Sequence, residues 1–279
     1  RGLGYVYKRQ ELYHAISTQA PDDLARELSI SEDKAELLLP TAMIYHNIFE
    51  ETDAEFMWLS GITICDGMAA DCAERKEHIV PAHPFSDDII SVSRKLAERF
   101  CCDTEHIHQV EIAALKLFDA LRKANHLTKK DRLLLQIAAI LHNCGSFLNL
   151  NDIGENSYKI VTSTEIIGLS HQERMIVAYV IRYTTGDFPE YSEIKNEFSR
   201  EEYIKIAKLN AILCLADAMD RSHQQKFTNF TVRKRGYDLT ITGQTLYDIT
   251  LEHGMFIQKS PFFEEAFGIR PVLRQKKCL

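Results

Sequence analysis

The almost entirely apolar run from Leu133 to Leu141 constrains this chain more than any other segment. A run of this length without a charged residue predicts a buried helix. It leads into His142 and Asn143, and Gly145 follows, which is a common way for a helix to present a ligand to a cleft and then stop. The sequence therefore predicts a buried helix whose end offers His142 to a site.

Helical patterns continue on both sides of this run, from residue 84 to about 223. Short polar residues with acids behind them open helices at Ser86, Asp103, Thr128 and Ser170, two of them as capping boxes. The segment from Glu201 to Arg221 carries apolar residues at helical spacing. Five or six helices with short links predict a helical bundle.

The first 80 residues have a different pattern. Pro40 interrupts an apolar helix and should kink or restart it, residues 56–60 resemble a short buried strand, and residues 67–75 predict a second helix. Residues 11–80 therefore predict a small α/β unit. Residues 1–10 lack an initiator Met and any pattern leading into the next helix, so we expect them to be non-native and the chain to be a fragment.

The spacing of apolar residues changes again in residues 224–279. Residues 227–232 and 237–242 alternate around Gly236, and residues 245–251 follow Gly243, which together predict three short antiparallel strands. A helix over residues 261–267 and a strand over residues 271–273 would complete a small α+β cap. The predicted fold class is thus mainly α.

Composition excludes several classes of protein. A net charge of −7 argues against a general nucleic-acid binder, and no stretch is long and apolar enough to span a membrane. Seven cysteines without a CxxC pair fit reduced thiols, so we expect a cytoplasmic protein. The sequence also lacks a Walker A loop and a nucleophile elbow.

Metal-ligand residue types occur near ends or inward faces of the predicted helices. They are His106, His142, Asn143 and Asp217. The order resembles the HD phosphohydrolase signature, in which a divalent cation polarises a phosphoryl group, but Asn143 stands where that signature has Asp. A carboxamide binds such a cation only weakly, so we predict a degenerate and empty site. Alternatively, His142 only caps its helix and Asp217 pairs with Arg221 at i+4.

Basic residues recur on and after the later helices. The predicted substrate-binding set is Arg182, Lys208, Arg221, His223 and Lys226, with Arg233, Lys234 and Arg235 on the hairpin. Such a group could bind a phosphate chain through charge-assisted hydrogen bonds, or it could be an ordinary solvated surface.

Ordered motifs along the chain resemble the Ppx/GppA phosphatase family. The segment 34–40 with Ser60-Gly61-Ile62 is similar to the end of its actin-like half. The segments 141–145, 168–170 and 215–223 are similar to its LHDIG, G-(F/L)-S and LADALDRSH motifs. The resemblance implies an actin-like remnant over 11–80, an HD-like helical domain over 81–223 and a cap over 224–279.

The resemblance also implies an activity that this chain only partly carries. The family removes terminal phosphate from inorganic polyphosphate or guanosine pentaphosphate, and its phosphate loops and catalytic acid lie upstream. No catalytic residue and no cofactor is therefore expected in this chain, and Mg²⁺ is implied for the full-length bacterial enzyme. Besides Asn143, Thr184 replaces a family histidine. We expect a homodimer that contacts neither membrane nor nucleic acid.

Two other functions remain open at this point. The chain could be a self-sufficient HD-type metal phosphohydrolase acting on a nucleotide, or a non-catalytic sensor of a phosphate ligand. Metal content separates the first of these from the other functions, and activity of the chain joined to its upstream half separates an enzyme from a sensor.

Overall fold

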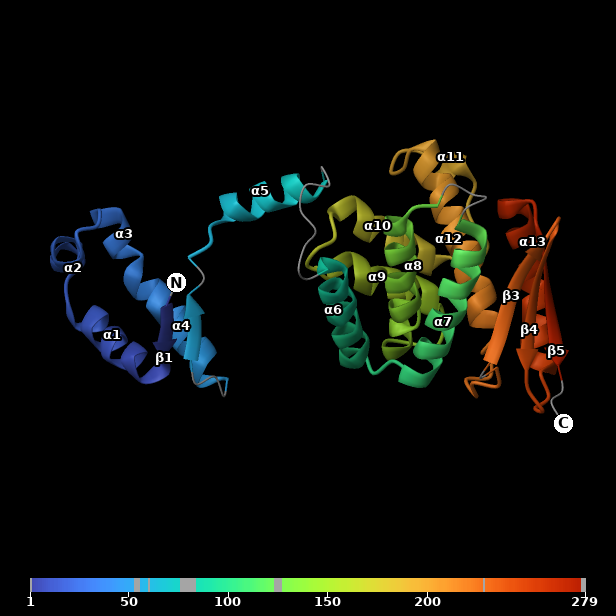
Figure 1. Ribbon diagram of the computed structural model, residues 1–279, viewed down its shortest axis with the longest axis horizontal. Coiled ribbons are helices and arrows are strands. Elements are labelled where there is room, and N and C mark those ends of the chain that lie inside the picture. The colour runs from blue at the N-terminus through green and yellow to red at the C-terminus, as the bar shows by residue number, and fades with distance from the viewer. Residues whose placement is uncertain are drawn as a thin grey trace. The chain divides into compact units, whose positions relative to one another are not determined.

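Figure 1 shows the computed structural model, which describes residues 2–52, 56–59, 61–75, 84–122, 127–227 and 229–276. The chain divides into two compact units, residues 1–82 and 83–279, and each is treated by itself below. As predicted, the fold is mainly helical with a small three-stranded sheet. Within the described part of the chain, no helix has the length and apolar character that crossing a bilayer requires.

The described residues of the N-terminal unit form two short strands and five helices. In chain order these are β1 (Gly2–Tyr5), α1 (Val6–Thr18), α2 (Pro21–Leu28), α3 (Glu32–Glu36), α4 (Leu38–Glu50), β2 (Phe56–Leu59) and α5 (Ile64–Arg75). The strands pair antiparallel, with Gly2 opposite Leu59. The helix restarts at Leu38, so Pro40 lies in its first turn, where a proline is tolerated.

The N-terminal unit matches the expected succession of helix, strand and helix, and its described side chains form a small core. Ile16, Leu24, Ala25 and Ala35 form its cluster of buried side chains. Residues 2–5 and 6–10, which we expected to be non-native, form β1 and the start of α1. The origin of this unit as an actin-like remnant stays a prediction.

The C-terminal unit begins with a bundle of helices around α8. The bundle comprises α6 (Phe85–Arg99), α7 (Thr104–Leu121), α8 (Lys129–Leu141), the 3-10 turn η2 (Cys144–Phe147), α9 (Ile153–Ser163), α10 (His171–Arg182), α11 (Tyr191–Ile194) and α12 (Arg200–Ala218). Helices α6, α7, α10 and α12 all contact α8, whose last seven residues are all buried except the half-buried Gln136. The predicted capping boxes at Thr128 and Ser170 are both confirmed.

The cap is a three-stranded sheet with one helix. It consists of β3 (Asn229–Arg235), β4 (Asp238–Gln244), α13 (Thr250–Phe267) and β5 (Arg270–Lys276), with strand order β3-β4-β5. Strands β3 and β4 form the predicted antiparallel hairpin, and Gly236 in its turn has a φ of 59°. One continuous core extends from Ile89 on α6 to Leu273 on β5, so bundle and cap form one unit.

The strand predicted over residues 245–251 is wrong, whereas the strand predicted over residues 271–273 is confirmed as part of β5. Residues 245–251 form no strand, because the Asp248 side chain accepts hydrogen bonds from Thr250 N (3.1 Å) and Oγ1 (2.6 Å) where α13 begins. The free edge of β4 is instead occupied by β5, which runs parallel to it, with Ile241 opposite Leu273. Parallel pairing requires a crossover, and α13 supplies it.

Candidate functional site

His106 enters the core from the first turn of α7. The Asp103 side chain caps this helix by accepting a hydrogen bond from His106 N at 3.2 Å. The cap sets the start of α7, so that the side chain of its third residue turns inward. His106 is only 1% exposed. A local capping motif thus positions the first member of the site.

His142 follows the last residue of α8 and is also buried. Ser157 on α9 ties down this helix end, because its Oγ donates to His142 O (2.9 Å) and accepts from Gly145 N (2.8 Å). A Cβ atom at Gly145 would lie 2.5 Å from Ser157 N, so only glycine permits this approach of η2 to α9. The predicted helix stop is therefore also a packing contact.

Asp217 on α12 completes a cluster of three converging donor atoms. Its Oδ1 lies 3.3 Å from His106 Nε2 and 3.6 Å from His142 Nε2, and the two Nε2 atoms lie 3.2 Å apart. All three donor atoms fall within 4.8 Å of one another. The structure thus brings together three of the four residues predicted as metal ligands, from three different helices.

Hydrogen bonds on the far side of each imidazole fix its orientation. His106 Nδ1 donates to Asp220 Oδ2 at 2.9 Å, and His142 Nδ1 donates to Ala139 O at 2.7 Å. Both acceptors can only accept, which assigns a proton to each Nδ1 and directs each Nε2 at the cluster. Asp220 is itself held by Gln225 N, 2.7 Å from its Oδ1. This is the arrangement in which protein metal sites orient histidine ligands.

The cluster carries a strong electrostatic bias toward a positive charge. Burial opposes protonation of His106, but hydrogen bonds to Asp217 and Asp220 and their charges outweigh it and raise its pKa to about 9. Burial likewise opposes ionisation of Asp217, but hydrogen bonds from the two imidazoles hold its pKa far below the usual range. Arg221 adds a cation, with its guanidinium 3.8 Å from Asp217 Oδ2.

Asn143, the fourth predicted ligand, forms two hydrogen bonds through its backbone carbonyl. Its carbonyl accepts from Ser146 N (3.1 Å) and Ser146 Oγ (2.7 Å) in η2. Two imidazoles and one carboxylate fit an open mononuclear site of the zinc type. They do not fit a two-metal centre at this position, because the neutral amide of Asn143 cannot bridge two cations as a carboxylate does.

The predicted substrate-binding residues divide into two groups. His223 and Arg221 lie at the cluster: the His223 ring stacks on His106 with centroids 3.6 Å apart, and its Nδ1 lies 3.0 Å from Asp103 Oδ2. The other three have partners elsewhere in the unit. Arg182 pairs with Glu155 at 2.7 Å, Lys226 pairs with Glu252 at 3.1 Å, and Lys208 lies 5.9 Å from the Phe267 ring.

Sequence reasoning missed the residues that support the cluster. Asp220 was available as a signal, because it follows Asp217 at i+3 and so lies on the same side of a helix. Asp103 was recognised only as a cap, although its second oxygen contacts His223. The role of Gln225 depends on a left-handed turn (φ 46°) and had no sequence signal.

Comparison with known proteins gives matches of two kinds, to a family model and to curated proteins. The model of Ppx/GppA phosphatase, domain III, matches residues 90–258, which is more than half of the chain. The guanosine-5'-triphosphate,3'-diphosphate pyrophosphatase of Aeromonas hydrophila subsp. hydrophila is 23% identical over 241 residues, 84% of this chain and 46% of that protein. This chain therefore spans about half the length of the curated relative.

Proposed function

Because the chain belongs to the Ppx/GppA phosphatase family, we propose that it forms the C-terminal portion of an enzyme that removes terminal phosphate from inorganic polyphosphate or guanosine pentaphosphate. The observation that carries this proposal is the domain III match over residues 90–258, which falls inside the compact unit 83–279. The printed name of the curated relative describes action on a guanosine polyphosphate.

In this proposal the chain binds the polyanion and contacts a second copy of itself. The upstream half would supply the phosphate loop, the catalytic acid and the Mg²⁺ site, and the enzyme would act in the bacterial cytoplasm. The sequence supports this division of labour, since it contains no glycine-rich phosphate loop of the Walker type. The chain by itself would then bind substrate without hydrolysing it.

The buried cluster supports a structural role without a resident metal. Protonated His106 lies between the carboxylates of Asp220 and Asp217, which are 2.9 Å and 3.3 Å from its ring nitrogens. With Arg221 beside Asp217, two positive charges balance two negative ones. In this role a proton on His106 would take the place of a cation, and the cluster would hold α7, α8 and α12 together.

The HD-type phosphohydrolase is the second candidate, and the convergence of three donor atoms favours it. His106 Nε2, His142 Nε2 and Asp217 Oδ1 would hold the cation, which would supply a Lewis acid for a phosphoryl oxygen. The chain's own residues would then act in defined ways. Asp220 and Ala139 O would orient the imidazoles, and Arg221 at the edge would bind a phosphate oxygen.

Two preparations test the proposal: the purified chain, and the same chain joined to its upstream half. We expect the joined protein to release phosphate from polyphosphate or guanosine pentaphosphate, and the chain alone to release none at ordinary enzyme rates. Restoring the carboxylate with Asn143→Asp should not create activity in the chain alone. Hydrolysis by the chain alone, accompanied by about one bound metal and lost in His142→Ala, would instead support the HD-type enzyme.

A further inference from the structure

The three-stranded sheet of the cap has one buried and one exposed face. Leu239, Ile241 and Leu273 point into the core, and alternation puts the intervening residues on the opposite side. We call this opposite side the outer face. The strand register places Arg233 opposite Thr240, Thr240 opposite Val272, and Gln244 opposite Lys276, so all three strands contribute to it.

The outer face is strongly basic although the chain is acidic. Register and alternation assign it five cations and one acid: Arg233, Arg235, Arg270, Arg274, Lys276 and Asp238. Asp238 is already paired, because Arg270 Nε donates to its Oδ1 at 3.0 Å. Among the residues that the structure describes, the other four cations form no ion pair, and all four are exposed. A net positive charge thus gathers on one small face of a chain of net charge −7.

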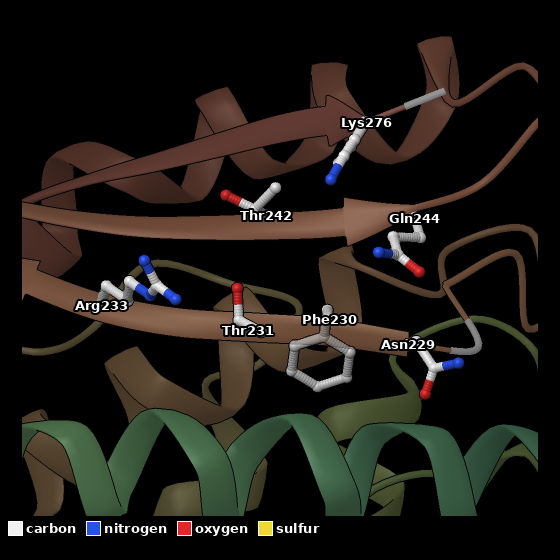
Figure 2. A pocket seen from close by; sticks show the side chains of 7 residues that line it. All are labelled: Asn229, Phe230, Thr231, Arg233, Thr242, Gln244 and Lys276. Atoms are coloured by element: carbon white, nitrogen blue, oxygen red, sulfur yellow. The ribbon is translucent and has the colours of Figure 1, made fainter. Parts of the chain in front are cut away.

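A groove of about 450 Å³ runs across this face. Figure 2 shows its side chains on the three strands, with α7, in green, passing along β3. Its lining includes Arg233 from β3 and Lys276 from β5, with Thr231, Thr242 and Gln244 between them. The groove therefore has a cation on each outer strand and hydroxyl and amide donors in the middle.

A further cation borders the groove from the bundle. Lys116 on α7 lies with its Nζ 4.2 Å from the centroid of the Phe230 ring, which also lines the groove. The same Nζ donates to Phe230 O at 3.3 Å. A carbonyl and an aromatic face do not neutralise an ammonium, so Lys116 extends the positive field along the edge of β3.

The chemistry of the outer face fits a chain of phosphates better than a nucleic acid. Guanidinium, ammonium, hydroxyl and amide groups all donate to phosphate oxygens. Single-stranded nucleic acids are bound largely by stacking of bases on exposed aromatic rings, whereas Phe230, which carries the one aromatic ring among the described residues that line the groove, is only 5% exposed. The spacing also favours a long ligand, because β3 and β5 are roughly 10 Å apart and one orthophosphate cannot reach both.

We propose that the outer face binds inorganic polyphosphate, with Arg233, Arg274 and Lys276 contacting successive parts of one chain. This inference rests on the proposed function and names its substrate and docking surface. It places that surface on the sheet of the cap, in addition to the predicted set on the helices, whose cations Arg182 and Lys226 are engaged by Glu155 and Glu252.

The test compares two triple variants of the purified chain that lose the same charge. The first is Arg233→Ser, Arg274→Ser and Lys276→Ser. The control is Lys129→Ser, Lys195→Ser and Arg200→Ser, which removes three exposed cations of the helices that have no ion pair among the described residues. We expect the first to lower affinity for long-chain polyphosphate at least tenfold and the control to change it less than twofold.

Three further measurements sharpen the result. Affinity should rise from orthophosphate to tripolyphosphate to long chains, and the salt dependence should be shallower in the first triple variant, because fewer counterions are released. Replacing the two arginines by lysine should retain most of the affinity. Equal losses in both triple variants, tighter binding of polyuridylate RNA than of polyphosphate, or affinity independent of chain length would each overturn the inference.

Activity of the chain joined to its upstream half separates this inference from the proposed function. If the joined protein hydrolyses polyphosphate and the first triple variant binds and hydrolyses it normally, the docking surface is wrong and the proposed function stands. If the joined protein hydrolyses neither polyphosphate nor guanosine pentaphosphate, the proposed function fails, whatever the chain binds.

Discussion

Removing one partner of the ion pair between Lys226 and Glu252 should be one of the most destabilising single changes in the C-terminal unit. Glu252 is fully buried in the first turn of α13, and the Lys226 side chain is 12% exposed with its Nζ 3.1 Å from the carboxylate. Ser222 also donates to Glu252, through its backbone N at 3.2 Å and through its hydroxyl. The carboxylate is therefore satisfied entirely by three donor groups of the chain.

Lys226→Met removes the cation and leaves the buried carboxylate behind. Breaking one side of a buried pair costs about 3–5 kcal/mol, and we expect about 3 because the Ser222 donors and the α13 N-terminus remain. For a unit of this size that corresponds to a fall in Tm of roughly 6–12 °C. The double variant with Glu252→Gln should recover part of the loss, because the neutral amide needs no cation.

The direction in which this loss of stability changes with pH follows from the pKa of Glu252. Burial opposes ionisation of Glu252, but the hydrogen bonds from Ser222 and the charge of Lys226 lower its pKa below the ordinary value. A carboxyl group whose pKa is lowered by folding stabilises the fold at pH values above its pKa in the unfolded chain, which is about 4.3. This stabilisation is lost as the pH falls through the lower pKa of the folded state. The deficit of Lys226→Met should therefore be largest at neutral pH and shrink as pH falls below about 4.

Urea denaturation followed by far-UV circular dichroism measures the deficit. Arg270→Ala, at an ion pair whose side chains are 62% and 43% exposed, is the control and should cost less than about 1 kcal/mol. A cost below 1 kcal/mol for Lys226→Met at pH 7 would refute the reasoning.

Three further outcomes are expected from the cluster and its surroundings. Gly145→Ala should destabilise the unit by about 1–3 kcal/mol, because the new Cβ would lie 2.5 Å from Ser157 N. Gly186→Ala is the control and should be nearly neutral, since the space around its new Cβ is open. Thermal melts of the two variants compare their stabilities. His106→Asn should cost most stability below about pH 6.5 and progressively less up to about pH 9. The reason is that a histidine with a raised pKa stabilises the fold only while the folded form holds the extra proton. A loss of stability that grows with pH would contradict this. Elemental analysis of the purified protein should find far less than one transition metal per chain, and stoichiometric metal that disappears in Asp217→Ala would overturn the assignment of an empty site.

Local features of the fold were predictable from the sequence, and pairings between distant segments were not. The capping boxes at Thr128 and Ser170 are read from four consecutive residues, and both helices begin there. Alternation predicted β4 as a strand, but residues 245–251 were predicted as the third strand of its sheet, and the pairing of β4 with the other predicted strand, residues 271–273, was not predicted. Helix α9 was not predicted, and Asp152 before it has a φ of 53° and makes no capping hydrogen bond, although its residue type is common at such positions.

The candidate site shows the same division. His106, His142 and Asp217 were identified by residue type and by position on helices, and three helices of one bundle bring them together. Their supporting contacts depend on tertiary structure: Asp220 lies 114 residues after His106 in the chain, and its i+3 spacing from Asp217 places it on the same side of α12 without naming His106 as its partner. The sequence also did not predict the partners of Lys226 and Arg182, so it could not distinguish a solvated cation from a buried one.

The contacts of α7 with the end of the unit have a consequence for the order of folding. Asp103, His106 and Gln109 contact residues 120, 114 and 118 positions later in the chain. Closing such long loops is slow, because their entropy is lost before the contacts form. A ribosome must therefore make most of the unit before α7 can form these three contacts. Until then the apolar faces of the early helices that they cover are open to chaperones and to other chains.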